Sequence, residues 1–142
     1  MKFQLYSQLL RLDYSNDHLL QMYYVLYYEL PPQEKEMAKN IHKLIETREK
    51  IKLELRRYIH HLKTAENAST LEKRIADFLP VYLKLEYLTK NTFSDPNWEQ
   101  CYKKERENLR LYYETLYNRN LTSSTADLLQ QQMDELRAVP TE

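Results

Sequence analysis

The sequence predicts an all-α protein, an antiparallel bundle of four to five helices built around one long central helix, with no β-sheet. Three observations predict this class. Apolar residues recur in alternating steps of four and three along much of the chain. No run of alternating residues bounded by turn signals indicates a strand, and the 142 residues include no glycine. Residues 1–138 are expected to form a single domain, with a frayed C-terminal tail at 139–142.

The longest helix is expected over residues 33–63, and the other helices are expected to pack against it. Its apolar positions follow the coiled-coil-like spacing of a helix packed along its whole length, and only Arg48 interrupts them: Met37, Ile41, Leu44, Ile51, Leu55, Tyr58 and Leu62. Because the neighbouring helices are shorter, one end could project and expose apolar residues, which makes a homodimer a hypothesis. The residues concerned are Ile51, Leu55, Tyr58, Ile59 and Leu62.

The N-terminal part is expected to contain helices at 1–12 and 18–30, or one bent helix, because nothing in residues 13–17 forbids helical dihedrals. The second piece should be buried on most sides. One face carries Leu19, Met22, Tyr23, Leu26, Tyr27 and Leu30. Pro31 and Pro32 should end this helix, since proline lacks the backbone donor and disfavours helical dihedrals in the residue before it.

Three further helix starts are predicted. Ser69 and Glu72 form a capping box, and Pro80 should kink the helix that follows. The segment Ser94-Asp95-Pro96 should open the next helix. Residues 123–127 should open a last one with a narrow apolar stripe that packs weakly.

Without glycine, helix ends need another residue that tolerates the left-handed conformation, and asparagine is the next choice. Asn67, Asn91 and either Asn118 or Asn120 are therefore interpreted as helix stops.

Composition excludes several classes of function. Phosphate-binding loops, dinucleotide-binding turns and nucleophile elbows need glycine, so these sites are not expected. Basic and acidic residues are equal in number, 21 each, so only a local patch could attract a charged partner. One cysteine, Cys101, fits a reducing compartment, and a cytoplasmic protein is expected. No segment is apolar and long enough to predict a membrane partner.

Enzymatic and metal chemistry are not expected either. The chain lacks the Glu-x-x-His motifs of di-iron bundles, and its four histidines are few and do not share one helix face. Cys101 is a lone thiol with no placed histidine. We therefore predict no enzyme, cofactor or catalytic residue, and keep a small-ligand or metal-binding bundle only as a weaker alternative.

Two charged residues interrupt the apolar spacing. Arg48 and Glu105 each lie near the middle of a predicted helix. A bidentate pair between them would offset the cost of burying both charges. The alternative is that the Arg48 side chain extends to the surface of the bundle and that Glu105 lies in water at the edge of a helix–helix contact.

A nucleic-acid interface is one alternative function. Basic side chains follow one stripe of the long helix and could contact phosphates: Lys52, Arg56, Arg57, His60 and Lys63. The stripe is short, however. Tyrosine rings could stack on single-stranded bases, but most of the 13 tyrosines lie at helix-packing positions.

The preferred function is the binding of another protein, as an adaptor, inhibitor or assembly subunit. Tyrosine offers a large rigid area with a polar tip and is enriched in interfaces. Tyr24, Tyr28 and Tyr113 lie beside the main apolar stripes and are the candidate binding residues. Burial of these three beneath a further helix is the alternative.

Overall fold

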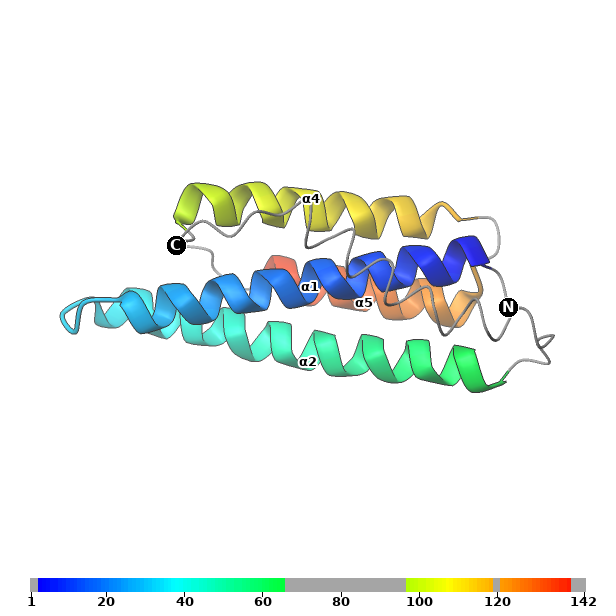
Figure 1. The fold of residues 1–142 in the computed structure, drawn as a ribbon, viewed down its shortest axis with the longest axis horizontal. Helices are drawn as coiled ribbons and strands as arrows, with labels where there is room; N and C mark the ends of the chain where they lie inside the picture. Colours follow the sequence, from blue (N-terminus) through cyan, green and yellow to red (C-terminus); the bar gives the residue numbers. More distant parts are fainter. Residues whose placement is uncertain (1–2, 66–96, 119–120, 139–142) are drawn as a thin grey trace.

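The computed structural model describes residues 3–65, 97–118 and 121–138, and these form four α-helices (Figure 1). They are α1 (Phe3–Glu29), α2 (Lys35–Ala65), α4 (Trp98–Leu116) and α5 (Ser123–Ala138). No strand occurs in these residues, so the predicted all-α class is confirmed. None of the described helices is long and apolar enough to cross a membrane.

Each of these helices packs extensively against two of the others. α1 lies against α2 and α4, and α5 also lies against α2 and α4. Figure 1 shows that the helices run lengthwise beside one another and that each packed pair is antiparallel. In the described part, α2 is therefore one member of a ring of four helices, although it is the longest.

α1 is one helix of 27 residues, and the interruption considered at residues 13–17 is absent. Ser15 and Asn16 favour turns and caps because their side chains can bond nearby backbone. Here both side chains are buried and bond to Asn108 of α4 instead. The helix ends at Glu29, just before Pro31 and Pro32.

The starts of α4 and α5 are each capped by the side chain of the residue just before the helix, and α5 starts within the predicted residues 123–127. α4 is capped by Asn97, whose Oδ1 accepts from the backbone N–H of Gln100 at 2.9 Å. The predicted Ser94-Asp95-Pro96 start lies outside the described residues. α5 begins at Ser123, and the Oγ1 of Thr122 just before it accepts from the backbone N–H of Thr125 at 3.3 Å.

Asn118 does not end α4 in the predicted left-handed conformation, because no described residue has a positive φ. Tyr117 ends α4 with φ −87°, and the Asn118 side chain donates to Gln8 Oε1 of α1 at 2.6 Å. Asn67, Asn91, Asn120, the capping box at Ser69, the kink at Pro80 and the tail at 139–142 all fall outside the described residues.

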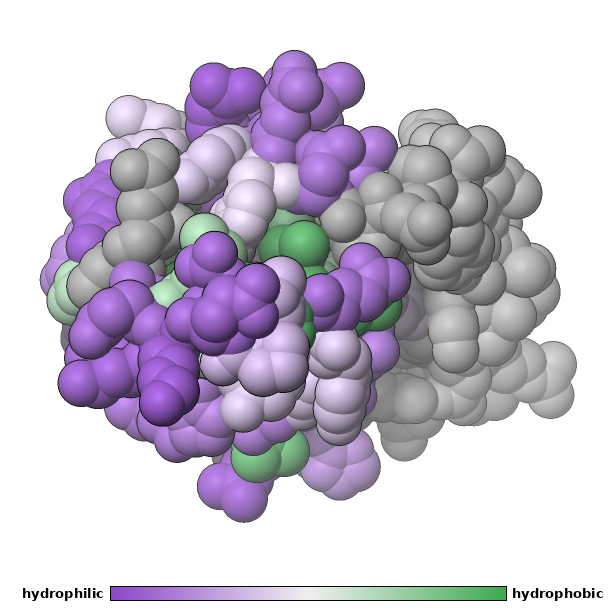
Figure 2. Space-filling model, turned by 90° about the vertical axis from the view of Figure 1, so that its left-hand side faces the viewer, coloured by the Kyte–Doolittle hydropathy of each residue, from purple (hydrophilic) through white to green (hydrophobic). Residues whose placement is uncertain are grey.

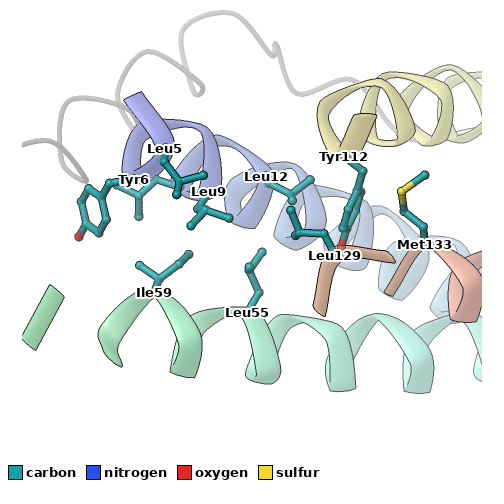
Figure 3. Close-up of a cluster of buried hydrophobic side chains, with 10 residues drawn as sticks. Leu5, Tyr6, Leu9, Leu12, Leu55, Ile59, Tyr112, Leu129 and Met133 are labelled. Carbon is teal, nitrogen blue, oxygen red and sulfur yellow. The ribbon is translucent and has the colours of Figure 1, made fainter. Parts of the chain in front are cut away.

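The core consists of two clusters. The first joins all four described helices (Figure 3), with Leu9, Leu12, Leu55, Tyr112 and Leu129 fully buried in it. The second joins α1, α2 and α4, and contains Leu19, Tyr23, Ile41, Leu44 and Cys101. We call them the Leu12 cluster and the Leu19 cluster.

The residues predicted to form a sticky projecting end of the long helix are used within the chain. Ile51, Leu55 and Ile59 are buried, and Tyr58 and Leu62 pack against the Leu12 cluster. The projecting-end hypothesis is corrected here, because α1 and α5 supply apolar partners along this part of α2. The buried Ile51, Leu55 and Ile59 pack within the chain, and a homodimer stays an untested prediction.

Candidate functional site

The three tyrosines proposed for protein binding do not form one face. Tyr28 is 82% exposed and Tyr113 is 42% exposed, whereas Tyr24 is half-buried. α1 and α4 are antiparallel, and Tyr112 lies level with Asn16, with which it shares a hydrogen bond. Tyr28 lies more than three turns beyond Asn16, roughly 18 Å along the axis at 1.5 Å per residue.

Two of these three tyrosines are engaged with neighbouring helices. The hydroxyl of Tyr24 donates to Glu49 of α2. Tyr113 accepts a hydrogen bond from Arg137 of α5, whose guanidinium carbon lies 5.7 Å from the centre of the Tyr113 ring. Tyr24 and Tyr113 thus connect adjacent helices, and only Tyr28 presents most of its ring to solvent.

Tyr28 belongs to an exposed group of apolar and aromatic residues where α1 turns into α2. Val25 and Tyr27 are each 37% exposed, and Pro31 and Pro32 are exposed as well. We call Val25, Tyr27, Tyr28, Pro31 and Pro32 the α1-end surface. Figure 2 views this end of the molecule, where hydrophilic residues cover most of the described surface and a few hydrophobic ones show near its middle.

Aromatic contacts hold part of the α1-end surface in place. The rings of Tyr27 and Tyr28 lie 6.1 Å apart in an edge-to-face arrangement, and Tyr27 also lies 6.2 Å from the ring of His42 on α2. The sequence placed Tyr27 on the buried face of its helix. The four-and-three spacing of this helix is complete without Tyr27, since it runs through Leu19, Tyr23, Leu26 and Leu30. This spacing could have identified Tyr27 as an exposed residue.

The predicted basic stripe faces acidic residues of α1. Lys52 Nζ lies 2.7 Å from Asp17 Oδ1, and Arg56 Nε donates to Asp13 Oδ2 at 3.1 Å. Burial raises the pKa of the Asp13 carboxyl, and the Arg56 charge partly offsets this. Two of the stripe's cations are therefore already paired. Arg57 and His60 are exposed, and the Lys63 side chain is outside the described part.

Arg48 and Glu105 lie in direct contact. Arg48 Nη2 is 2.5 Å from Glu105 Oε2, with the Arg48 side chain fully buried and that of Glu105 23% exposed. The contact is not bidentate, because Nη1 instead donates to Asn16 Oδ1 and Asn108 Oδ1, each at 2.9 Å. The second oxygen of Glu105 accepts from Tyr23 Oη at 2.5 Å. Burial and the adjacent Glu105 charge raise the pKa of Tyr23.

Asn16 and Asn108 are polar core residues that sequence reasoning missed. Both are buried, and each lies in a four-and-three series of its helix. On α1 the series runs through Leu9, Leu12, Asn16, Leu19 and Tyr23, and on α4 through Cys101, Glu105, Asn108, Tyr112 and Thr115. Following the spacing through polar residues would have found both asparagines.

The described residues offer little for covalent or metal chemistry. No group of three or more His, Cys, Asp or Glu side chains that could hold a metal ion occurs among them. Cys101 is 1% exposed, and burial raises the pKa of its thiol to about 12. A thiol with this pKa is neutral at physiological pH and is a poor nucleophile.

A shallow pocket of about 290 Å³ lies between α1 and α2, and it combines apolar side chains with Asp13, Arg56 and His60. The apolar lining consists of Tyr6, Leu10, Tyr14 and Ile59. Its volume is at the lower end of the range for small-molecule sites, roughly 300–1,000 Å³. The Asp13–Arg56 pair occupies part of its polar wall.

No family model, curated protein or solved structure matches this chain.

Proposed function

We propose that this chain is a non-enzymatic helical-bundle domain spanning residues 1–138 that binds another protein through the α1-end surface. The observation that carries the proposal is the 82% exposure of Tyr28, beside the partly exposed Val25 and Tyr27. An exposed aromatic group of this kind is costly to leave in water and is typical of protein interaction sites. A cytoplasmic location is part of the proposal, because a chain with one cysteine has no internal disulfide, as is usual in a reducing compartment.

The shape of the α1-end surface supports the same function. The rings of Tyr27 and Tyr28 pack edge to face, and the ring of His42 on α2 lies near that of Tyr27. Rings held in this way lose little conformational entropy when a partner covers them. Tyr28 is therefore the expected anchor residue, with Val25 and the two prolines around it.

The test is the substitution Tyr28→Ala in the full chain, followed by affinity purification from cells that produce it. We expect the co-purifying protein to bind at least about 2 kcal/mol more weakly, the range of an interface anchor. The melting temperature should stay near that of the parent, because Tyr28 is mostly solvent-exposed. Calorimetric titration of the recovered partner provides the measurement.

Tyr117→Ala is the matched control. Tyr117 is 84% exposed, close to the value for Tyr28, and it ends α4, the helix antiparallel to α1. The control should bind the partner as the parent does. Equal binding by the parent and Tyr28→Ala, or a loss confined to Tyr117→Ala, would contradict the proposal.

Nucleic-acid binding by the basic stripe remains the alternative function, with weaker support. Lys52 and Arg56 would have to leave Asp17 and Asp13 before they could contact phosphates. Co-purification of nucleic acid that dissociates at high salt is the observation that would favour it.

A further inference from the structure

A closed circuit of hydrogen bonds passes through all four described helices. Arg48 Nη1 of α2 donates to Asn16 Oδ1 of α1 at 2.9 Å, and Asn16 Nδ2 donates to Tyr112 Oη of α4 at 3.1 Å. Tyr112 Oη then donates to Gln132 Oε1 of α5 at 2.8 Å. Gln132 Nε2 donates to the backbone carbonyl of Ile51 at 3.3 Å, which returns the circuit to α2 one turn after Arg48.

The four side chains of the circuit are fully buried, each at 0% exposure. Water cannot replace a partner that moves away from such a site, so each broken bond leaves a buried polar group unsatisfied. Burial also raises the pKa of Tyr112 to about 12. The direction of donation around the circuit is set by its two ends, because the Arg48 guanidinium can only donate and the Ile51 carbonyl can only accept.

Part of the circuit lies between the two hydrophobic clusters, whereas Tyr112 belongs to the Leu12 cluster. On α1, Leu12 belongs to one cluster, Leu19 to the other, and Asn16 lies between them. Apolar residues in four-and-three steps present a similar surface after a slip of one turn. On α5, such a slip would replace Gln132 by Leu129 or Leu136. Apolar packing alone would discriminate weakly between these registers, whereas the amide of Gln132 can reach Tyr112 and Ile51 in only one.

We propose that the circuit sets the helix register, and that α5, held by Gln132, slips by a turn along α2 when its link is removed. A buried polar residue in an otherwise apolar helix seam is a known means of specifying register. The link from α5 is the simplest to test because it involves no charge. α1 and α4 are held separately by Asn108, whose Nδ2 donates to Ser15 Oγ and Asn16 Oδ1.

The test measures register by crosslinking pairs of cysteines with a short bifunctional thiol reagent in the full chain carrying Cys101→Ala. Lys50→Cys with Glu135→Cys reports the observed register, because the side chains of Lys50 and Glu135 meet at 3.0 Å. Slipped registers are reported by Lys50→Cys paired with Gln131→Cys, one turn earlier on α5, or with Ala138→Cys, about one turn later. A slip of one turn moves α5 by about 5.4 Å, so the crosslinking yield of each pair depends on the register.

Gln132→Leu removes the two circuit bonds of Gln132 while keeping a side chain of similar volume. We expect the ratio of slipped to observed-register crosslinked product to rise about tenfold or more, as the loss of two buried hydrogen bonds implies. A pair joining α1 to α4, Gln8→Cys with Asn118→Cys, is the internal control. Its side chains are 2.6 Å apart, and its yield should not change.

Tyr112→Phe is the second variant. This substitution breaks the circuit by deleting one hydroxyl. If circular dichroism shows that Gln132→Leu has lost helix, Tyr112→Phe is used for the test in its place. The same increase in slipped products is expected. If the variants that remain folded are crosslinked only in the observed register, the proposal is overturned.

Discussion

Arg48 shows how much a single buried side chain depends on its surroundings. The guanidinium has no exposure and bonds to three acceptors on two helices, Asn16, Asn108 and Glu105. Its Nε has no hydrogen-bond acceptor among the described residues. Glu105, in contrast, is 23% exposed and is also held by Tyr23. The two members of this ion pair are therefore unequal, and removing one should not cost the same as removing the other.

We expect Glu105→Met to lower the free energy of unfolding by about 3–5 kcal/mol, because it leaves a fully buried positive charge without its counter-ion. Arg48→Met should cost less, about 2–3 kcal/mol, since Glu105 can reach water and keeps its bond to Tyr23. The double variant should be more stable than the sum of the single changes predicts. Urea unfolding of the four proteins gives these values.

Lys50→Met and Glu135→Met provide the matched control, a double-mutant cycle on a solvent-exposed ion pair. Lys50 Nζ and Glu135 Oε1 are 3.0 Å apart. Their effects should be additive. Additivity in the Arg48–Glu105 cycle as well would mean that the observed contact contributes no coupling energy.

At the scale of the element, sequence reasoning succeeded where a single periodic pattern ran unbroken. The position and type of α2 followed from its apolar spacing, and the end of α1 followed from Pro31 and Pro32. It was less successful where polar residues occupy core positions. Ser15 and Asn16 resemble a turn in sequence, although Asn16 continues the four-and-three spacing of α1, and both bond to Asn108 of α4 in the core.

The exposure of Tyr24, Tyr28 and Tyr113 could not be predicted from their own helices. Tyr24, Tyr28 and Tyr113 all lie beside apolar stripes, but whether a neighbour covers them depends on Glu49 and Arg137, which come from other helices. Helical spacing fixes directions on one helix and says nothing about the neighbour that packs there. The assignment of these three tyrosines to a binding site therefore stays a prediction, and of the three only Tyr28 is mostly exposed.

The start of α4 makes a prediction at this scale. Asn97 has extended backbone dihedrals, and its side chain accepts the backbone N–H of Gln100, as an N-cap does. Asn97→Ala should lower the free energy of unfolding by about 1 kcal/mol, whereas Asn97→Asp should keep the parent value or exceed it. Chemical denaturation is the measurement, and equal stability of the Ala and Asp variants would contradict this role for Asn97.

At the scale of the whole molecule, the question is whether the two clusters unfold together. α1, α2 and α4 contribute to both clusters, and the buried circuit, which includes Tyr112 of the Leu12 cluster, bonds to all four described helices. Elements shared in this way are expected to couple the clusters into one cooperative unit. The chain carries one tryptophan, Trp98, which packs against the Leu19 cluster, so its fluorescence reports on that cluster alone.

Leu9→Ala tests this coupling from the opposite cluster. Leu9 is fully buried in the Leu12 cluster (Figure 3), and its truncation should cost about 2–5 kcal/mol. If the clusters are coupled, the urea midpoint seen by Trp98 fluorescence should fall together with the midpoint seen by circular dichroism, although Leu9 belongs to the other cluster. A fluorescence midpoint that keeps its parent value while the circular dichroism midpoint falls would show two independently unfolding halves. The circuit would then divide the core rather than join it.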